Sequence, residues 1–212
     1  MEQEFHGIQN VLDGRVLYNQ AFNAESFRAA LEQRPPIVHV ASHFTFSPGD
    51  EENSSLLLGD GSELTLAEIR KRYRFVNVDL VSLSACETGK DGKDEKDENG
   101  VEVEGLGVIV QKRGAKGVLA TLWKVDDKST GEFMRLFYDY WRHRGLTKAK
   151  ALQKAQLAFI HGEVDKALAE VAARGKFTDA SGKAVEQPPT PKEATPDHPY
   201  YWAPFILMGN WL

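Results

Sequence analysis

The chain has 212 residues, a length that fits one domain with a substantial hydrophobic core. Its 42% apolar and 27% charged residues exclude a wholly disordered or fibrous protein. The formal net charge is −5, from 26 basic and 31 acidic residues with no basic block, so we expect no nucleic-acid partner.

Four segments have the continuous apolar character of buried, parallel β-strands. In chain order they are 36–42, 76–85, 115–123 and 203–211. Residues 14–19, with the sequence GRVLYN, are a candidate for one more strand at an edge of the sheet.

Between these strands the apolar residues recur with a helical period. Thr65 and Glu68 have the spacing of a capping box, which predicts that a helix starts there. Gly114 is expected to end a helix that begins at Val101. The other predicted helices cover 23–33, 129–145, 147–162 and 163–175. This order predicts an α/β fold in which a mostly parallel sheet carries helices on both faces, as one domain over residues 1–212.

The sequence also limits where the protein works. No apolar run approaches the roughly 20 residues that span a bilayer. The first ten residues lack the basic and then apolar pattern of a signal peptide. We therefore expect a cytoplasmic protein with no membrane partner.

Reactive side chains follow the predicted strands, at the sheet edge where open α/β folds bind ligands. His43 follows the first strand, Cys86 the second, and Asp126 and Asp127 the third. A thiol beside an imidazole can carry out acyl transfer, because the histidine takes the thiol proton and later returns it to the leaving amine. A lone cysteine at a strand end is also a common packing residue, and periodicity alone favours that alternative. His39 is interpreted as a hydrogen-bonded histidine of the core or one that supports a catalytic group.

Several motifs together resemble the CHAT domain, a bacterial relative of the caspase, separase and gingipain group of cysteine peptidases. They are HVASHF, DLVSLSACETG, EGLGVIVQKRGAKGVLATLWKVDD, FYDYW, ALQKAQLA and HPYYWAPFILMG, which follow the family order from His39 to Gly209. The resemblance implies a caspase-like sheet and a catalytic dyad of His43 and Cys86. It also implies oxyanion donors in the backbone N–H groups of Phe44 and Cys86, and neither a metal nor an organic cofactor.

The sequence departs from the family at Phe44, where the family has a glycine after the histidine. A phenylalanine keeps the N–H donor, but it lacks the conformational freedom of glycine and could narrow substrate access.

The family pattern also places a carboxylate for a basic P1 side chain of the substrate on Asp127, with Asp126 as its neighbour. An alternative stays open, because acidic residues are favoured at a helix N-terminus whatever the function. The charged stretch Lys90 to Gly100 likewise has two interpretations: a solvated loop, or an activation loop that the enzyme cuts itself.

The expected function is that of a cysteine endopeptidase that cleaves a protein substrate after a basic residue, under the control of a partner or sensor domain. The alternative is a catalytically silent interaction module with the same fold. The family context implies the C-terminal domain of a larger bacterial protein with tetratricopeptide repeats. The abrupt start suggests such a fragment, or a domain that has lost its earliest strand.

Overall fold

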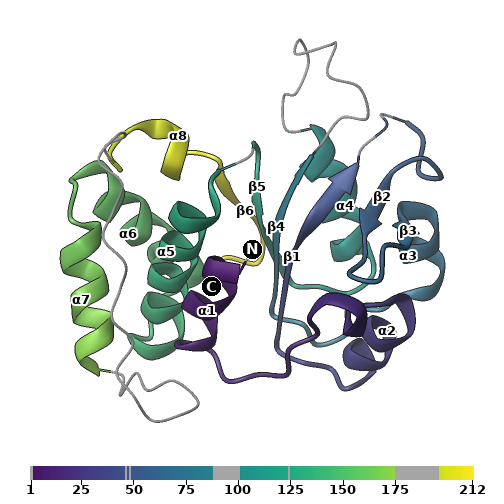
Figure 1. Ribbon diagram of the computed structural model, residues 1–212, viewed down its shortest axis with the longest axis horizontal. Helices are drawn as coiled ribbons and strands as arrows, with labels where there is room; N and C mark the ends of the chain where they lie inside the picture. Colours follow the sequence, from purple (N-terminus) through teal and green to yellow (C-terminus); the bar gives the residue numbers. More distant parts are fainter. Residues whose placement is uncertain (1, 46, 48, 88–100, 124, 175–195) are drawn as a thin grey trace. The chain divides into compact units, whose positions relative to one another are not determined.

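The computed structural model describes residues 2–45, 47, 49–87, 101–123, 125–174 and 196–212 (Figure 1). It divides into two compact units. The sheet unit comprises 15–124 and 204–211, and the helical unit comprises 1–14, 125–203 and 212. The proposed self-cleavage loop Lys90 to Gly100 lies outside the described residues, so that hypothesis stays a prediction.

The sheet unit is built on a six-stranded sheet with the order β3-β2-β1-β4-β5-β6. The strands are β1 (Ile37–Thr45), β2 (Ser55–Leu57), β3 (Glu63–Thr65), β4 (Leu80–Glu87), β5 (Gly117–Thr121) and β6 (Phe205–Gly209). The central strands β1, β4 and β5 are parallel, whereas every pair that includes β2, β3 or β6 is antiparallel. The predicted α/β fold is therefore confirmed, with the parallel part at the centre of a mixed sheet.

One face of this sheet carries the hydrophobic core of the unit. The helices are α2 (Ala24–Glu32), α3 (Leu66–Arg72) and α4 (Val101–Lys112), with a short 3₁₀ turn η1 (Asn19–Ala21). The helices gather on one side of the sheet (Figure 1), where Phe27, Ile69 and Val110 share a buried cluster with Val40 and Phe44 of β1. Because side chains alternate along a strand, the residues between Val40 and Phe44 divide between this face and the opposite one.

The helical unit is arranged around α5. It contains α1 (Glu2–Gln9), α5 (Asp127–Tyr138), a π-helical turn η2 (Asp139–His143), α6 (Lys148–Ile160), α7 (Val164–Arg174) and α8 (Pro199–Trp202). Helix α5 is buried from Phe133 to Tyr138 and packs against α1, α6 and α7. Helix α1 approaches α5 closely, since a Cβ added to Gly7 would lie 3.4 Å from the carbonyl oxygen of Gly131.

The helix caps follow the sequence prediction. The backbone N–H of Glu68 donates to Thr65 Oγ1 at 3.2 Å, and the N–H of Thr65 donates to Glu68 Oε2 at 3.3 Å, which completes the capping box. The N–H of Lys150 likewise donates to Thr147 Oγ1 at 3.3 Å at the start of α6. The strand predicted over 14–19 is wrong, because these residues lead into η1, where Asn19 adopts a φ of +48°.

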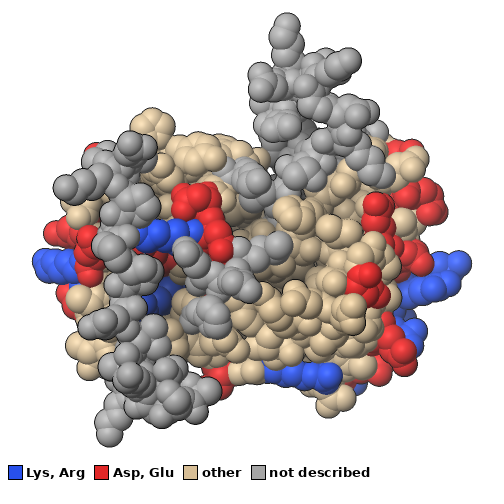
Figure 2. Space-filling view, in the orientation of Figure 1, with Lys and Arg blue, Asp and Glu red and all other residues tan. Residues whose placement is uncertain are grey.

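Charged side chains of the sheet unit occur as mixed pairs. Figure 2 shows basic and acidic side chains close together near α2 and α3. Arg70 Nε lies 3.0 Å from Glu51 Oε2, and Arg72 Nη1 lies 3.8 Å from Glu68 Oε1. Such exposed pairs contribute little to stability.

A carboxylate of α5 makes the stability of the helical unit depend on pH. Burial raises the pKa of Glu132, while Lys128, 3.7 Å away, partly offsets the rise. A raised folded-state pKa means that stability falls as pH rises through that value. We therefore expect Glu132→Gln to raise the free energy of unfolding at pH 7, with an advantage that disappears below about pH 4, where Glu is protonated in the unfolded chain.

Urea unfolding of both proteins at pH 4 and pH 7 measures this effect. Glu163→Gln is the matched control, because Glu163 is exposed and also pairs with a lysine, Lys166. A lower stability of Glu132→Gln at pH 7 would mean that the ion pair with Lys128 outweighs the cost of burial.

Candidate active site

The two candidate catalytic residues occupy neighbouring positions at the carboxyl end of the parallel strands. In the register of β1 with β4, His43 is the Cα partner of Cys86. Neighbouring strands lie about 4.8 Å apart, and residues in register lie on the same face of a sheet. The structure therefore places the main chains at His43 and Cys86 side by side.

The aliphatic residues of β1 and β4 and the hydrogen bonds at the start of the pair explain this register. Both strands are rich in aliphatic residues, and they pair over eight registered positions from Ile37↔Leu80 to Phe44↔Glu87. The N–H groups of Asp79 and Leu80 both donate to the carbonyl oxygen of Pro36, at 2.7 and 3.3 Å, where the pair begins. A slip by one residue would move every buried side chain of β4 to the other face.

Phe44 belongs to the core and not to the face that carries His43. Its side chain is 4% exposed and lies in the same buried cluster as Val40, whereas His43 is half-buried. Because adjacent strand residues point to opposite faces, the phenyl ring does not narrow the approach to His43. The main chain of Phe44 is paired on both sides, with Leu56 of β2 and Glu87 of β4.

Hydrogen bonds of serine hydroxyl groups hold the carboxyl end of β1 and the chain that follows it. The N–H of Ser47 donates to Ser54 Oγ at 2.9 Å, and Ser54 Oγ donates to the carbonyl oxygen of Asp50 at 2.7 Å. Ser54 is fully buried. Within β1, Ser42 Oγ donates to the carbonyl oxygen of Leu57 at 2.5 Å. These bonds tie the carboxyl end of β1 to β2 and fix the backbone around His43.

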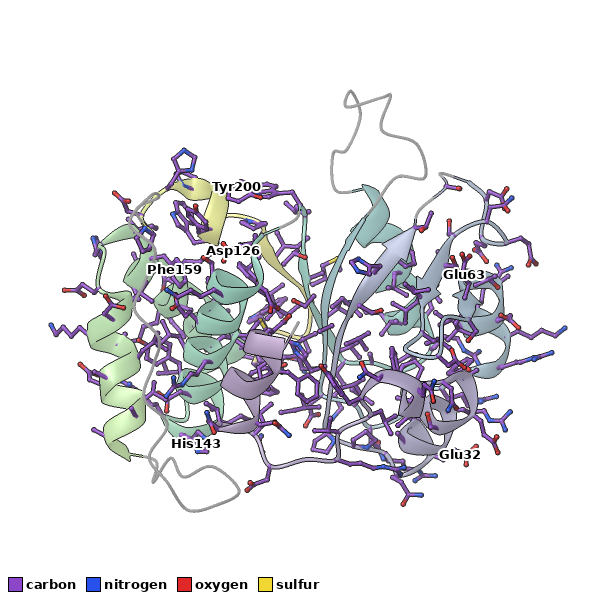
Figure 3. All side chains as sticks on the ribbon, viewed as in Figure 1. Glu32, Glu63, Asp126, His143, Phe159 and Tyr200 are labelled. Atoms are coloured by element: carbon purple, nitrogen blue, oxygen red, sulfur yellow. The ribbon has the colours of Figure 1, made fainter. Side chains whose placement is uncertain are left out.

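The candidate P1 carboxylates belong to the start of α5 in the helical unit. Asp126 is the N-cap of α5 (labelled in Figure 3), where its Oδ1 accepts the N–H of Ser129 at 2.9 Å. The helix-cap interpretation is thereby confirmed for Asp126. Asp127 is the first residue of α5 and is half-buried. Its role in substrate binding stays a prediction.

Two tryptophans of the sheet unit are exposed. Trp123 is 37% exposed and Trp211 is 61% exposed. Trp123 comes two residues after the last residue of β5, in the same unit as His43 and Cys86. No sequence signal distinguishes Trp123 from a core tryptophan, because it follows an apolar strand and tryptophans there are more often buried.

In the part of the chain that the structure describes, no group of three or more His, Cys, Asp or Glu side chains is placed to hold a metal ion. None of the described helices is long and apolar enough to cross a membrane.

The sequence was also compared with known proteins. The family model of the CHAT domain matches residues 1–210, which include parts of both units. No curated protein matches the sequence. The match covers almost the whole chain and agrees with the α/β fold and with the order of the motifs. The chain therefore belongs to the CHAT domain family, which is part of the caspase-like peptidase group.

Proposed function

We propose that this CHAT domain is a cysteine endopeptidase with Cys86 as nucleophile and His43 as general base and acid. The observation that carries the proposal is their register at the carboxyl end of two adjacent parallel strands. At this spacing an imidazole and a thiol are within reach of a shared proton. The membership in a caspase-like peptidase family supports the same assignment.

The proposed reaction has two steps. His43 takes the thiol proton, and the thiolate of Cys86 attacks the scissile carbonyl carbon to give a tetrahedral oxyanion. The C–N bond then breaks, and His43 gives its proton to the leaving amine. In the second step His43 takes a proton from water, and the hydroxide attacks the thioester. The peptide leaves as a carboxylic acid, and the thiol is restored.

The backbone N–H groups of Cys86 and Phe44 are the proposed oxyanion donors. The registered pairs of β4 with β5 end at Leu83, so β4 extends beyond them toward Cys86. This supports Cys86 as a donor, because its N–H lies where the ladder with β5 has ended. Phe44 is the weaker donor, because it has a registered partner on each side.

We further propose that the enzyme prefers a basic P1 side chain, with Asp127 as the carboxylate that binds it. The assignment follows the family pattern, which places this carboxylate on Asp127, four residues after Trp123. Control by a partner or sensor region belongs to the same proposal.

Labelling with a peptidyl acyloxymethyl ketone that carries Arg at P1 tests this function. We expect one inhibitor molecule to become covalently attached to the intact protein, on the peptide that contains Cys86. We expect none to become attached to Cys86→Ala. The same reagent with Asp at P1 is expected to react at least about tenfold more slowly, because the Asp127 carboxylate would repel a like charge. Intact mass and peptide mapping give the readout.

Two variants that each remove one negative charge distinguish the roles of Asp127 and Asp126. Asp127→Asn is expected to abolish the preference for the Arg reagent. Asp126→Asn is the matched control, since asparagine caps a helix as well as aspartate and only the charge is lost. Equal rates with both reagents on the unmodified chain would contradict the basic P1 preference. A lack of labelling, alone and with a partner region added, would favour the silent interaction module.

A further inference from the structure

Trp123 is an exposed aromatic residue at the edge of the sheet that carries the proposed dyad. All residues of β5, from Gly117 to Thr121, are buried. The chain then bends at Leu122 and Trp123, and the tryptophan is 37% exposed. The exposed part of the indole is an apolar surface that a ligand side chain can cover.

The packing of Leu122 determines on which face Trp123 lies. Val118 and Ala120 belong to the core cluster on the α2, α3 and α4 side of the sheet, and the partly buried Leu122 packs against that cluster. The N–H of Leu122 donates to the carbonyl oxygen of Pro204 at 3.0 Å, so the backbone at this point is still held beside the start of β6. Trp123, the next residue, therefore falls on the opposite face. That is also the face of His43, because its neighbour Phe44 belongs to the core side.

The register sets the position of Trp123 along the sheet. Ser82 of β4 is the Cα partner of Leu119 of β5. Cys86 and Trp123 each lie four residues after this registered pair. Trp123 is therefore at the same position along the strand direction as the proposed nucleophile. With β4 between β1 and β5, the sites of His43 and Trp123 are about 10 Å apart, two strand spacings.

We propose that Trp123 contacts the substrate and binds a large apolar side chain of the peptide next to the scissile bond. The proposal rests on the peptidase function proposed above. An extended peptide rises about 3.3 Å per residue, so side chains one or two residues from a scissile carbonyl at Cys86 lie about 3–7 Å along the peptide from it, a range that includes the spacing of about 4.8 Å between β4 and β5. Burial of an aliphatic or aromatic side chain against the exposed indole gives the preference.

Kinetics with matched peptides test the inference. One peptide set carries Leu or Phe at each position within two residues of the cleaved bond, and its partner set carries Ala there. We expect Trp123→Ala to lower kcat/KM for the best apolar peptide by about tenfold to a hundredfold and to leave the Ala peptide nearly unchanged. Trp123→Phe is expected to retain most of the discrimination.

Trp211→Ala is the matched control. Trp211 is also exposed and belongs to the same unit, but it follows β6 at the opposite edge of the sheet, since Gly209 pairs with Gly117 at the start of β5. We expect no change in selectivity in this variant. Unchanged selectivity in Trp123→Ala, with cleavage intact, overturns the inference and leaves the peptidase function standing.

A binding measurement separates the two proposals. In the Cys86→Ala background, fluorescence anisotropy of a labelled apolar peptide reports affinity without cleavage. One outcome is that the peptide binds, that binding is lost when Trp123 is replaced, and that the unmodified protein does not cleave the peptide. This outcome overturns the peptidase function and supports Trp123 as a peptide contact. If no peptide is bound and no peptide is cleaved, both proposals are overturned.

Discussion

Replacement of His43 with alanine is expected to lower kcat/KM for peptide hydrolysis by about 10²- to 10⁴-fold at pH 7. His43 is the registered neighbour of Cys86, so its loss leaves the thiol with no adjacent base at that position on β1. An unassisted thiol has a pKa of about 8.5, so only a few per cent is thiolate at neutral pH. The loss should therefore shrink at pH 9, where the thiolate forms without a base.

His39→Ala is the informative comparison for this prediction. His39 lies on the same strand and the same face as His43 but four residues earlier, about 13 Å away at the rise of a β-strand. We expect a much smaller loss than for His43→Ala, with no recovery at pH 9. Stopped or continuous fluorogenic assays at both pH values measure the difference. Equal losses in the two variants would contradict the assignment of His43 as the base.

The central strands could be predicted from sequence because each is a long apolar run. β1, β4, β5 and β6 all fall within or next to the predicted segments. The short hairpin of β2 and β3 was not predicted, because three residues are too few to show a period and its stability comes from pairing with β1. Helix α1 was missed for a related reason, since its packing on α5 through Gly7 is a tertiary contact.

The candidate site shows the same division between local and long-range information. Sequence reasoning could place His43 and Cys86 at strand ends, but adjacency of β1 and β4 depends on the sheet order. The exposure of Trp123 could not be predicted either, because a tryptophan after an apolar strand is more often buried. Local sequence patterns identify the candidate site residues, whereas the sheet topology decides which of them are neighbours in space.

Phe44→Gly, which restores the residue typical of the family, is expected to destabilise the fold severely. Removal of a buried phenylalanine side chain costs about 3–5 kcal/mol, and glycine within a strand costs roughly a further 0.5–1 kcal/mol. Phe44 is 4% exposed and packs in the core cluster with Val40 and Leu56. Since the whole stability of a domain is about 5–15 kcal/mol, the variant should be partly unfolded at 37 °C.

Denaturant unfolding followed by tryptophan fluorescence measures this loss, and Phe44→Leu is its control. Leucine keeps an apolar side chain in the core, so we expect a loss of about 1–2 kcal/mol. Phe44→Leu should also keep the labelling of Cys86, because it retains both the N–H donor and the register of His43 with Cys86. A Phe44→Gly protein as stable as the unmodified chain would place the ring outside the core. The glycine of the family could then return without a compensating change, and Phe44 would be a feature of the site and not of the fold.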